Sequence, residues 1–386
     1  MKIALVVPSI PKYSETFIIN KIKGLLDSGF EVVLMVVGVS EKRNIGIPVY
    51  YQPILAPSGP MRWVYTFWLI LGSLVKFPQK SLKLLGESGK AGYSGFGKWR
   101  MLAVLSNFLK IEVDWVHFAY GTMAIERAFI GKVLNAKTSM SLRGYDIAIH
   151  PLLHKNAYKN VWPYIDNVHS ISKDLISTAK EVGMPNKIKT QIIHPAIDTS
   201  RFNNLEKRNW NVKPKFLTVA RLHWKKGLEY TLEALALLEF DFSYTIIGEG
   251  PEYERLVFAA HQLGIADKVS FAGKKSEKEV TDAMLSHNYY LQYSIQEGFC
   301  NAVLEAQAAG MLCMVSDAEG LSENVRHQET GWVVKKRYPK MLTATIAYVI
   351  NLKTNVKDSI SKKATERVKT DFSLIQQKKQ FRQFFN

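Results

Sequence analysis

The chain has 386 residues, of which 47% are hydrophobic and 22% charged, a globular composition that excludes disordered, collagen-like and low-complexity classes. Its two cysteines, Cys300 and Cys313, exclude a disulfide scaffold or a cysteine-rich zinc site and favour a reducing compartment. The net charge of +17 is uneven, because residues 1–210 carry 27 basic and 14 acidic side chains (+13) and the rest carry 24 and 20 (+4), which predicts an anionic partner for the first half.

The first half alternates short apolar runs with helix-like segments. The runs lack a polar–apolar alternation, which is typical of parallel strands covered on both faces. The N-terminal run ends at Pro8, is too short for a signal peptide and is interpreted as the first strand. The strands expected in this half occupy residues 3–7, 31–37, 115–118, 139–142, 167–171 and 191–194.

Residues 63–75 form the most apolar stretch of the chain, rich in aromatic residues and bracketed by Arg62 and Lys76. With 13 residues it is too short to span a bilayer, which takes about 20. Two interpretations remain open. The stretch is either a helix packed in the core of the first domain or an interfacial segment that enters an anionic membrane surface, with Lys76, Lys80 and Lys83 contributing charge.

The second half repeats the alternation of strands and helices, which predicts a second doubly wound sheet. We expect domains at residues 1–200 and 211–364, with the polar stretch 202–211 as the linker. The tail, at residues 365–386, contains an amphipathic helix that could pack back on the first domain. The expected strands are residues 216–220, 244–248, 269–272, 289–293, 312–316 and 331–334.

Two carboxylates, Glu297 and Glu305, lie eight residues apart around a predicted helix at residues 301–309, which Gly310 would end. A strand precedes them, so Glu297 would lie at the carboxyl edge of the sheet, where ligands bind in open α/β folds. Free amides at the start of the helix suit an anion. Taken alone, both residues could equally be solvated surface acids.

A second feature is the run Arg221-Leu222-His223-Trp224-Lys225-Lys226-Gly227, which follows another predicted strand. Arg221 offers a forked donor and Lys226 a point charge, which together are what a diphosphate needs. The alternative is a surface loop that is simply basic. The sequence contains no P-loop, no H-E-x-x-H and no C-x-x-C, and Gly248-Glu249-Gly250-Pro251 is weak as a dinucleotide fingerprint.

Together these motifs resemble the family 4 glycosyltransferases, retaining enzymes of the GT-B fold, in which two Rossmann-like domains face a central cleft. The first domain is less similar, but Ser14-Glu15-Thr16-Phe17 and His117-Phe118-Ala119-Tyr120-Gly121 look like a branch that builds bacterial surface polysaccharides. In the second half the resemblance rests on Arg221…Lys226-Gly227, Ile247–Pro251, Glu297-Gly298-Phe299 through Glu305-Ala306, His194–Asp198 with Arg201-Phe202, Glu319–Glu323 and Thr330-Gly331-Trp332.

The resemblance implies a nucleotide-sugar donor, UDP- or GDP-linked, bound by the second domain. Arg221 and Lys226 would hold the diphosphate and stabilise charge on the departing phosphate. Glu297 would contact hydroxyls of the donor sugar near the amides of Gly298, Phe299, Cys300 and the helix start at Asn301. Glu305 would bind the ribose, and Gly248 and Gly250 would let the chain approach the nucleotide. The resemblance implies neither a metal ion nor a further cofactor.

One position departs from the family pattern, because Arg143 stands where many members have a histidine near the reacting carbon. A guanidinium cannot act as a base near neutral pH, so Arg143 could instead bind a phosphate or an acidic sugar, mark a weakened activity, or be a surface arginine after a strand. The acceptor would bind the first domain, with Ser14, Glu15, Thr16 and His117 as candidate contacts. Ser14 to Thr16 could equally cap a helix, and His117, His169 and His194 could be structural.

These observations predict a retaining transferase that moves a sugar to a glycan or a polyprenyl-diphosphate-linked glycan. Its expected location is the cytoplasm, peripheral on the inner face of the membrane. The alternatives are a sugar-nucleotide epimerase or a non-catalytic binding protein of the same fold. A nucleic-acid partner is not expected, because the basic residues are scattered and no recognition motif occurs.

Overall fold

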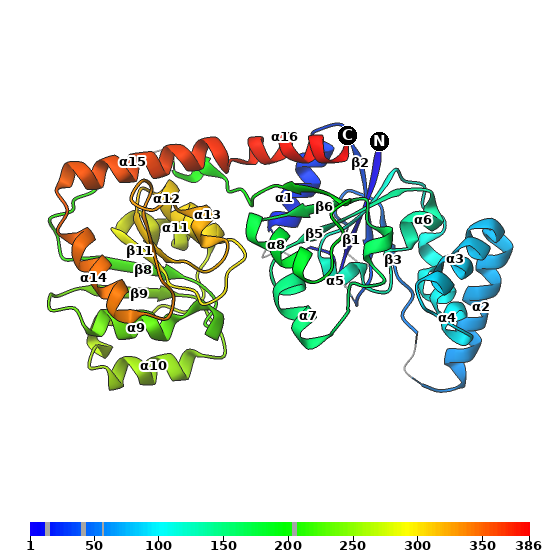
Figure 1. The fold of residues 1–386 in the computed structure, drawn as a ribbon, viewed down its shortest axis with the longest axis horizontal. Helices are drawn as coiled ribbons and strands as arrows, with labels where there is room; N and C mark the ends of the chain where they lie inside the picture. The colour runs from blue at the N-terminus through cyan, green and yellow to red at the C-terminus, as the bar shows by residue number, and fades with distance from the viewer. Residues whose placement is uncertain (12–15, 40–43, 56–57, 203–206) are drawn as a thin grey trace. The chain divides into compact units, whose positions relative to one another are not determined.

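The computed structural model describes residues 1–11, 16–39, 44–55, 58–202 and 207–386 (Figure 1). The chain divides into two compact units, one formed by residues 1–193 with 378–386 and the other by residues 194–377. The boundary therefore precedes the polar stretch 202–211 that the sequence suggested as a linker. Arg208 in this stretch is part of the second unit, because its guanidinium donates to the carbonyls of Met284 and Ala309.

Within its described residues, the first unit contains a seven-stranded parallel sheet in the order β3-β2-β1-β4-β5-β6-β7. All six strands expected from the sequence are present, whereas β3 was not expected. Apart from their first residues, the apolar strands β1 and β2 are buried along their length, as strands covered on both faces require. The strands are β1 (Lys2–Val7), β2 (Glu31–Val36), β3 (Val49–Tyr51), β4 (Trp115–Phe118), β5 (Lys137–Leu142), β6 (Asn167–Ser170) and β7 (Lys189–Ile192).

Helices flank this sheet, and three of them, α2 to α4, pack on one another in the long connection between β3 and β4 (Figure 1). Proline starts both α2 and α3, where its missing N–H costs no helical hydrogen bond. The helices are α1 (Thr16–Leu26), α2 (Pro60–Lys76), α3 (Pro78–Lys90), α4 (Phe96–Leu105), α5 (Gly121–Ala124), α6 (Ile130–Leu134), α7 (His150–Leu153), α8 (Lys173–Glu181) and the C-terminal α16 (Leu374–Phe385).

The end of α16 completes the core of the first unit. Phe381, Phe384 and Phe385 are buried in the same cluster as Leu5 of β1 and Leu34 of β2. The indole Nε1 of Trp115 also donates to the Phe385 carbonyl at 3.0 Å. The last residues of the chain thus belong to the unit that contains its first residues.

The described residues of the second unit form a six-stranded parallel sheet in the order β10-β9-β8-β11-β12-β13. All six strands were expected from the sequence, within one or two residues. They are β8 (Lys215–Val219), β9 (Ser243–Ile247), β10 (Val269–Phe271), β11 (Tyr289–Gln292), β12 (Leu312–Ser316) and β13 (Trp332–Val334). The helices are α9 (Leu228–Ala236), α10 (Tyr253–Gln262), α11 (Glu277–Ser286), α12 (Asn301–Ala308), α13 (Leu321–Asn324), α14 (Pro339–Ile350) and α15 (Thr354–Asp371).

Candidate active site

The motif residues of the second unit lie in loops that follow parallel strands. Arg221 and Lys226 follow β8, Gly248 and Gly250 follow β9, and Glu297 follows β11. Because the carboxyl ends of parallel strands lie at one edge of a sheet, these loops share that edge. The site is therefore assembled within the second unit, at the edge that the sequence predicted.

Lys226 and Glu297 are paired in this structure, since the Lys226 ammonium donates to the Glu297 carboxylate. Both side chains are largely buried, with exposed fractions of 17% and 13%. Ser294 donates a further hydrogen bond to the same carboxylate oxygen at 3.3 Å. Burial is the largest single influence and lowers the pKa of Lys226, but the charge and hydrogen bond of Glu297, together with Cys300, raise it by more, so the lysine is charged at neutral pH.

Positive charge exceeds negative charge around this pair. Lys225 lies close enough to Arg221, Glu297 and Lys226 for all three to affect its pKa, which burial lowers. Among the described residues the exposed Arg221 guanidinium makes no ion pair. Lys225, Lys226 and Arg221 thus lie close to one another, and Glu297 is the carboxylate that pairs with Lys226. This imbalance suits a doubly charged anion such as a diphosphate.

The two glycines after β9 are needed for the packing of neighbouring loops. Gly248 has a φ of 141°, and a Cβ there would lie 1.9 Å from the Ala220 carbonyl oxygen. At Gly250 a Cβ would lie 2.2 Å from the carbonyl oxygen of Leu222, whose own N–H donates to Glu249. The glycines therefore bring the β9 loop against the β8 loop that carries Arg221, which is a different reason for glycine from the nucleotide contact expected above.

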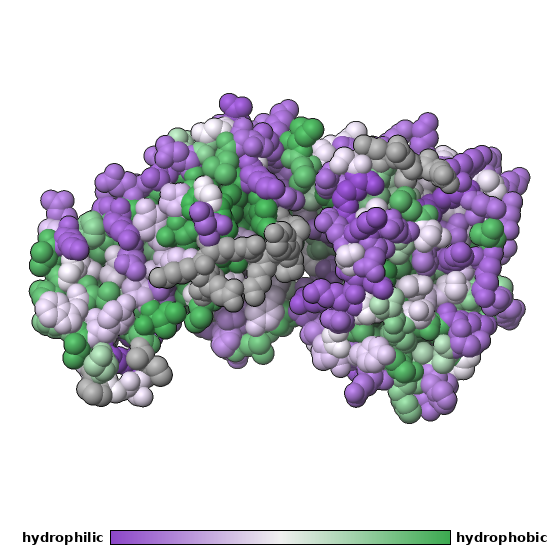
Figure 2. Space-filling view, turned by 180° about the vertical axis from the view of Figure 1, so that it is seen from behind, coloured by the Kyte–Doolittle hydropathy of each residue, from purple (hydrophilic) through white to green (hydrophobic). Residues whose placement is uncertain are grey.

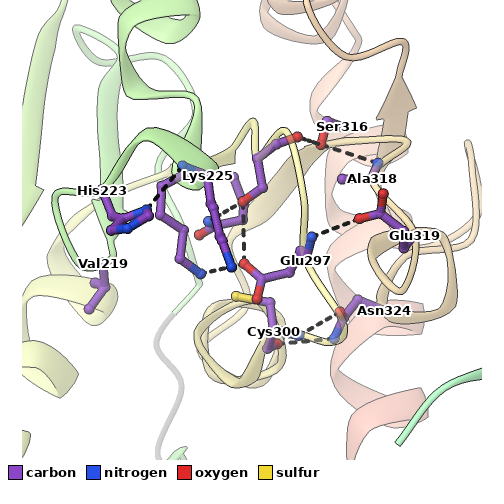
Figure 3. A network of polar contacts seen from close by, with 12 residues as sticks. Val219, His223, Lys225, Glu297, Cys300, Ser316, Ala318, Glu319 and Asn324 are labelled. Atoms are coloured by element: carbon purple, nitrogen blue, oxygen red, sulfur yellow. Dashed lines mark hydrogen bonds and ion pairs between the residues drawn. The ribbon is translucent and has the colours of Figure 1, made fainter. Parts of the chain in front are cut away.

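The loop from Glu297 to Cys300 is held by residues that follow β12 (Figure 3). The Glu297 amide donates to the Glu319 carboxylate at 2.8 Å, and the Gly320 amide donates to the Glu297 carbonyl at 3.0 Å. Asn324 is fully buried and bonds Cys300 twice, accepting from its amide and donating to its carbonyl, each at 3.0 Å. Sequence reasoning gave Glu319 no role and missed Asn324, since such contacts join residues more than 20 positions apart.

Four of the expected donor contacts are positioned by this loop and by the start of α12. Gly298 is buried, Asn301 is half-buried as the first residue of α12, and the Phe299 ring is 8% exposed. The Cys300 amide is already bonded to Asn324. Burial raises the pKa of the Cys300 thiol to about 12, which keeps the thiol protonated and unreactive at neutral pH.

Glu305 extends from α12 toward Arg201, with 3.4 Å between the guanidinium and carboxylate atoms. Arg201 also bonds the Glu277 carboxylate and the Thr281 hydroxyl of α11. Burial raises the pKa of Glu305, while the Arg201 charge opposes that rise. Arg201 was matched in sequence without a role, and the structure makes it the partner of the second motif carboxylate.

In the first unit, Arg143 follows β5 and is half-buried, so it is not the surface arginine considered from the sequence. Its guanidinium lies over the Phe17 ring, 3.7 Å from the centroid, and Nε donates to the Ala119 carbonyl at 3.3 Å. Burial lowers the pKa of Arg143 to about 10, so the side chain remains charged at neutral pH. The structure thus presents a fixed cation after β5.

His117 lies in β4 and is fully buried, so its ring is not placed where an acceptor could reach it. It is one member of a buried polar network. The His117 ring bonds Ser139 and Ser141, the Lys21 ammonium lies 3.0 Å from Nε2, and Ser141 in turn bonds His169. Of the other candidate acceptor residues, Ser14 and Glu15 lie outside the described residues, and Thr16 begins α1 with its side chain undescribed.

The apolar stretch 63–75 lies on α2, where most of its large apolar side chains are exposed while Thr66 and Ser73 are buried, so the interpretation as a core helix is wrong for the exposed face. Trp68 and Val75 are 63% and 72% exposed, and Trp63, Val64, Tyr65, Phe67 and Leu71 are exposed as well. Lys80 and Lys83 are occupied elsewhere, because their ammonium groups donate to the Leu109 carbonyl and the Asn135 side chain. Of the three lysines named from sequence, Lys76 at the end of α2 and Lys83 are exposed, and Lys80 is half-buried.

Green, hydrophobic side chains reach the surface over this helical segment, at the left end of Figure 2. Among the described residues, no helix has both the length and the apolarity to cross a bilayer. The same residues contain no cluster of three or more histidine, cysteine or acidic side chains arranged to hold a metal ion.

Residues 200–367 match the family model described as glycosyl transferases group 1, a segment that contains both motif carboxylates. The chain is similar over almost its whole length to the putative colanic acid biosynthesis glycosyltransferase WcaL of Salmonella typhimurium. The identity is 25% over 398 residues, covering 97% of this chain and 96% of WcaL. The amylovoran biosynthesis glycosyltransferase AmsK of Erwinia amylovora is also 25% identical, over 90% of each chain.

Among solved structures, Anabaena HepE in complex with UDP superposes with a TM-score of 0.73 at 14% identity and 99% coverage of both chains. A glycosyltransferase from Rickettsia africae gives a TM-score of 0.71 at 18% identity, covering 100% of this chain and 97% of that one. At such identities the likeness concerns the fold alone. It confirms the expected GT-B class, with two Rossmann-like parallel-sheet domains.

Proposed function

We propose that this chain, in which residues 200–367 match the family model of the group 1 glycosyl transferases, moves a sugar from a nucleotide-sugar donor to a glycan or a polyprenyl-diphosphate-linked glycan, with retention and without a metal ion. The relatives reported above are glycosyltransferases of exopolysaccharide synthesis, which favours transfer over an epimerase or a binding protein. The observation that carries the proposal is the grouping of three cations with Glu297 at one sheet edge, with Glu305 on the helix that follows.

Arg221 and Lys226 bind the donor diphosphate in this account. The bond between the anomeric carbon and the β-phosphate oxygen breaks, the carbon bonds to an acceptor hydroxyl, and the hydroxyl proton leaves with the diphosphate. Negative charge grows on the departing phosphate, where fixed cations stabilise it more than they stabilise the bound donor. The cations take the place that a divalent ion has in other transferases, so no cofactor is required.

Glu297 and Glu305 fix the other two parts of the donor. When a diphosphate draws Lys226 toward itself, the Glu297 carboxylate becomes available to hydroxyls of the transferred sugar. Glu305 accepts hydrogen bonds from the ribose while Arg201 keeps it charged. The donor is UDP- or GDP-linked, and the UDP bound to the similar HepE structure supports the first of these.

Arg143 contributes to acceptor binding in this account. Its guanidinium is charged, half-buried and fixed by Phe17 and the Ala119 carbonyl after β5. A diphosphate linked to a polyprenyl chain offers the oxyanions that a guanidinium binds with two parallel hydrogen bonds. The neutral variant Arg143→Gln is therefore expected to weaken the binding of the acceptor more than the binding of the donor.

The exposed face of α2 binds the membrane that holds such an acceptor. Val64, Trp68, Leu71 and Val75 recur at helical spacing and are exposed, and Lys76 ends the helix. An apolar face with aromatic and basic residues at its border suits the headgroup region of an anionic bilayer. We therefore propose that the protein acts on the cytoplasmic side of the membrane, where nucleotide sugars are made.

Vesicle sedimentation tests this surface. Trp68→Ala is expected to weaken binding to all vesicles about tenfold, because a large side chain contributes about 1.5 kcal/mol or more when buried. Lys76→Glu should weaken binding only to vesicles with anionic lipid, by about 1 kcal/mol per charge removed. Lys187→Glu, the same charge change at an exposed lysine between α8 and β7, is the matched control. Equal binding of all four proteins would contradict the proposal.

The donor proposal is tested by thermal unfolding with UDP, GDP, ADP, CMP and their sugars in the presence of EDTA. A nucleotide at 100 times its Kd stabilises the folded state by about 2.7 kcal/mol. We expect one base to raise the unfolding temperature and Glu305→Ala to abolish the rise. A rise that requires a divalent ion would contradict metal independence, and no rise with any nucleotide would contradict the proposed donor.

A further inference from the structure

Three aromatic rings pack together under the donor loop of the second unit. The His194 imidazole stacks on the Phe299 ring, with centroids 5.0 Å apart and an angle of 22° between the planes. Phe372 lies against both, at 5.7 Å from Phe299 and 5.5 Å from His194. Since Phe299 is two residues from Glu297, this three-ring cluster fixes the loop that carries the motif carboxylate.

Two rings of the cluster come from the segments that connect the units. The chain enters the second unit at His194 and leaves it after Gln377, shortly beyond Phe372. These segments are bonded together, because the Ile197 amide donates to the Phe372 carbonyl at 3.1 Å and the Gln377 side chain donates to the His194 carbonyl at 2.8 Å. Phe299 therefore rests on both connections.

A second set of contacts fixes the backbone of the same loop. Arg367 lies over the Phe372 ring, 4.9 Å from its centroid, and donates to the carbonyls of Glu323 and Asn324, each at 2.7 Å. The Asn324 side chain in turn holds Cys300, while the Glu323 carboxylate lies 3.7 Å from His194 Nε2. Ring and backbone of the loop thus depend on one group of residues.

We propose that His194 and Phe372 are positioning residues of the donor site, an inference that rests on the proposed function. They hold the Phe299 ring so that the loop keeps the Glu297 carboxylate at its place beside the donor, and they link the geometry of the donor loop to both connecting segments. Removing the imidazole takes away the ring that stacks on one face of Phe299. The ring can then tilt, and the loop moves with it.

The test compares His194→Ala, His194→Phe and the control His261→Ala, which alters an exposed histidine on α10. We measure kcat and KM for the donor, and the Kd of the matching nucleoside monophosphate by calorimetry, on the full chain. His194→Ala is expected to lower kcat/KM about tenfold or more, since small displacements of positioning groups have effects of this size. The Kd should stay unchanged, because Glu305 and Arg201 are not part of the cluster.

His194→Phe should recover most of the lost kcat/KM, because phenylalanine keeps a flat ring against Phe299. Phe372→Leu, which keeps apolar volume without a flat ring, should repeat the loss and serves if His194→Ala does not fold. Two results overturn this inference alone, provided that the wild-type chain turns over its donor. In the first, His194→Ala has the same kcat/KM as His261→Ala. In the second, His194→Phe does not recover the lost kcat/KM. A wild-type chain that binds and turns over no nucleotide sugar overturns the proposed function as well.

Discussion

Arg221 and Glu305 would contact different parts of a bound donor, the diphosphate and the ribose. Arg221 is exposed and makes no ion pair within the described residues, so its charge is available to a ligand. Glu305 is half-buried and already held by Arg201. The two residues should therefore have separable effects on nucleotide affinity.

We expect Arg221→Ala to weaken the binding of a nucleoside diphosphate about tenfold, because charge-assisted hydrogen bonds to the second phosphate are lost. The binding of the monophosphate should be weakened less. Glu305→Ala should weaken both nucleotides equally. Calorimetry measures both affinities, with the exposed Glu254→Ala of α10 as the control. If the ratio of diphosphate affinity to monophosphate affinity is the same in Arg221→Ala as in Glu305→Ala, this division of roles is contradicted.

Among the described residues, the buried network of the first unit is short of negative charge. Lys21 is 4% exposed, and its hydrogen-bond partners in that part of the chain are His117 and Ser141 rather than a carboxylate. Burial and the Arg143 charge lower the pKa of Lys21 well below 10.5. Burial, followed by the charge of Lys21, lowers the pKa of His117 well below 6.5. The folded state therefore favours the neutral forms.

This network makes stability depend on pH in a defined direction. Between each lowered pKa and its ordinary value the unfolded chain binds more protons than the folded chain, so the free energy of unfolding rises with pH across that window. One group contributes at most about 1.4 kcal/mol per pH unit. Lys21→Met should flatten the rise measured by urea unfolding from about pH 5 to about pH 9.

Lys23→Met is the matched control for that experiment, because Lys23 is exposed on the same helix, α1. It should keep the wild-type pH dependence. If Lys21→Met and Lys23→Met show the same slope as wild type, the buried lysine does not titrate as described.

At the scale of elements, α16 contributes three buried phenylalanine rings to the first unit's core. Phe385 is fully buried and contacts the rings of Trp115 and His117 edge-on. Removing this ring leaves a cavity between α16 and the sheet. We expect Phe385→Ala to lower the free energy of unfolding by about 3–5 kcal/mol, measured by denaturant unfolding.

Phe258→Ala on α10 is the control for that substitution, since its ring is 64% exposed. It should change stability by less than about 0.5 kcal/mol. A similar small effect for Phe385→Ala would show that α16 is dispensable to the core.

The elements themselves were largely predictable, because buried parallel strands have apolar sequences that end at turn residues. β3 was missed because Val49–Tyr51 is three residues long and only half-buried. The exposed face of α2 was not predictable with certainty, since an apolar run has the same composition in a core and at an interface. The partners of Lys80 and Lys83 depend on tertiary contacts 29 and 52 residues away.

The candidate site was predictable in its motif residues and less so in what holds them. Glu297, Glu305, Arg221 and Lys226 follow strands whose positions the sequence indicates. The Glu297–Lys226 ion pair and the Asn324 bonds to Cys300 join separate βα units. Spacing along one chain contains no signal for such pairs, so they had to come from the structure.

At the scale of the whole molecule, two units with separate cores predict two unfolding transitions. The donor residues lie in residues 194–377, whereas Phe385 belongs to the other unit. In calorimetric scans a nucleotide should raise one transition, and Phe385→Ala should lower the other. The assignment of the donor to residues 194–377 would be contradicted if a nucleotide raised the temperature of the same transition that Phe385→Ala lowers.

The most direct test of the whole account is the stereochemistry of transfer. The donor identified by the nucleotide panel is supplied with a ¹³C label at the anomeric carbon, with membrane lipids from a polysaccharide-producing bacterium as acceptor and EDTA in excess. NMR of the lipid fraction then gives the configuration of the new bond. We predict a lipid-linked product with the anomeric configuration of the donor, absent in Arg221→Ala/Lys226→Ala. An inverted product, or transfer that EDTA abolishes, would contradict the account.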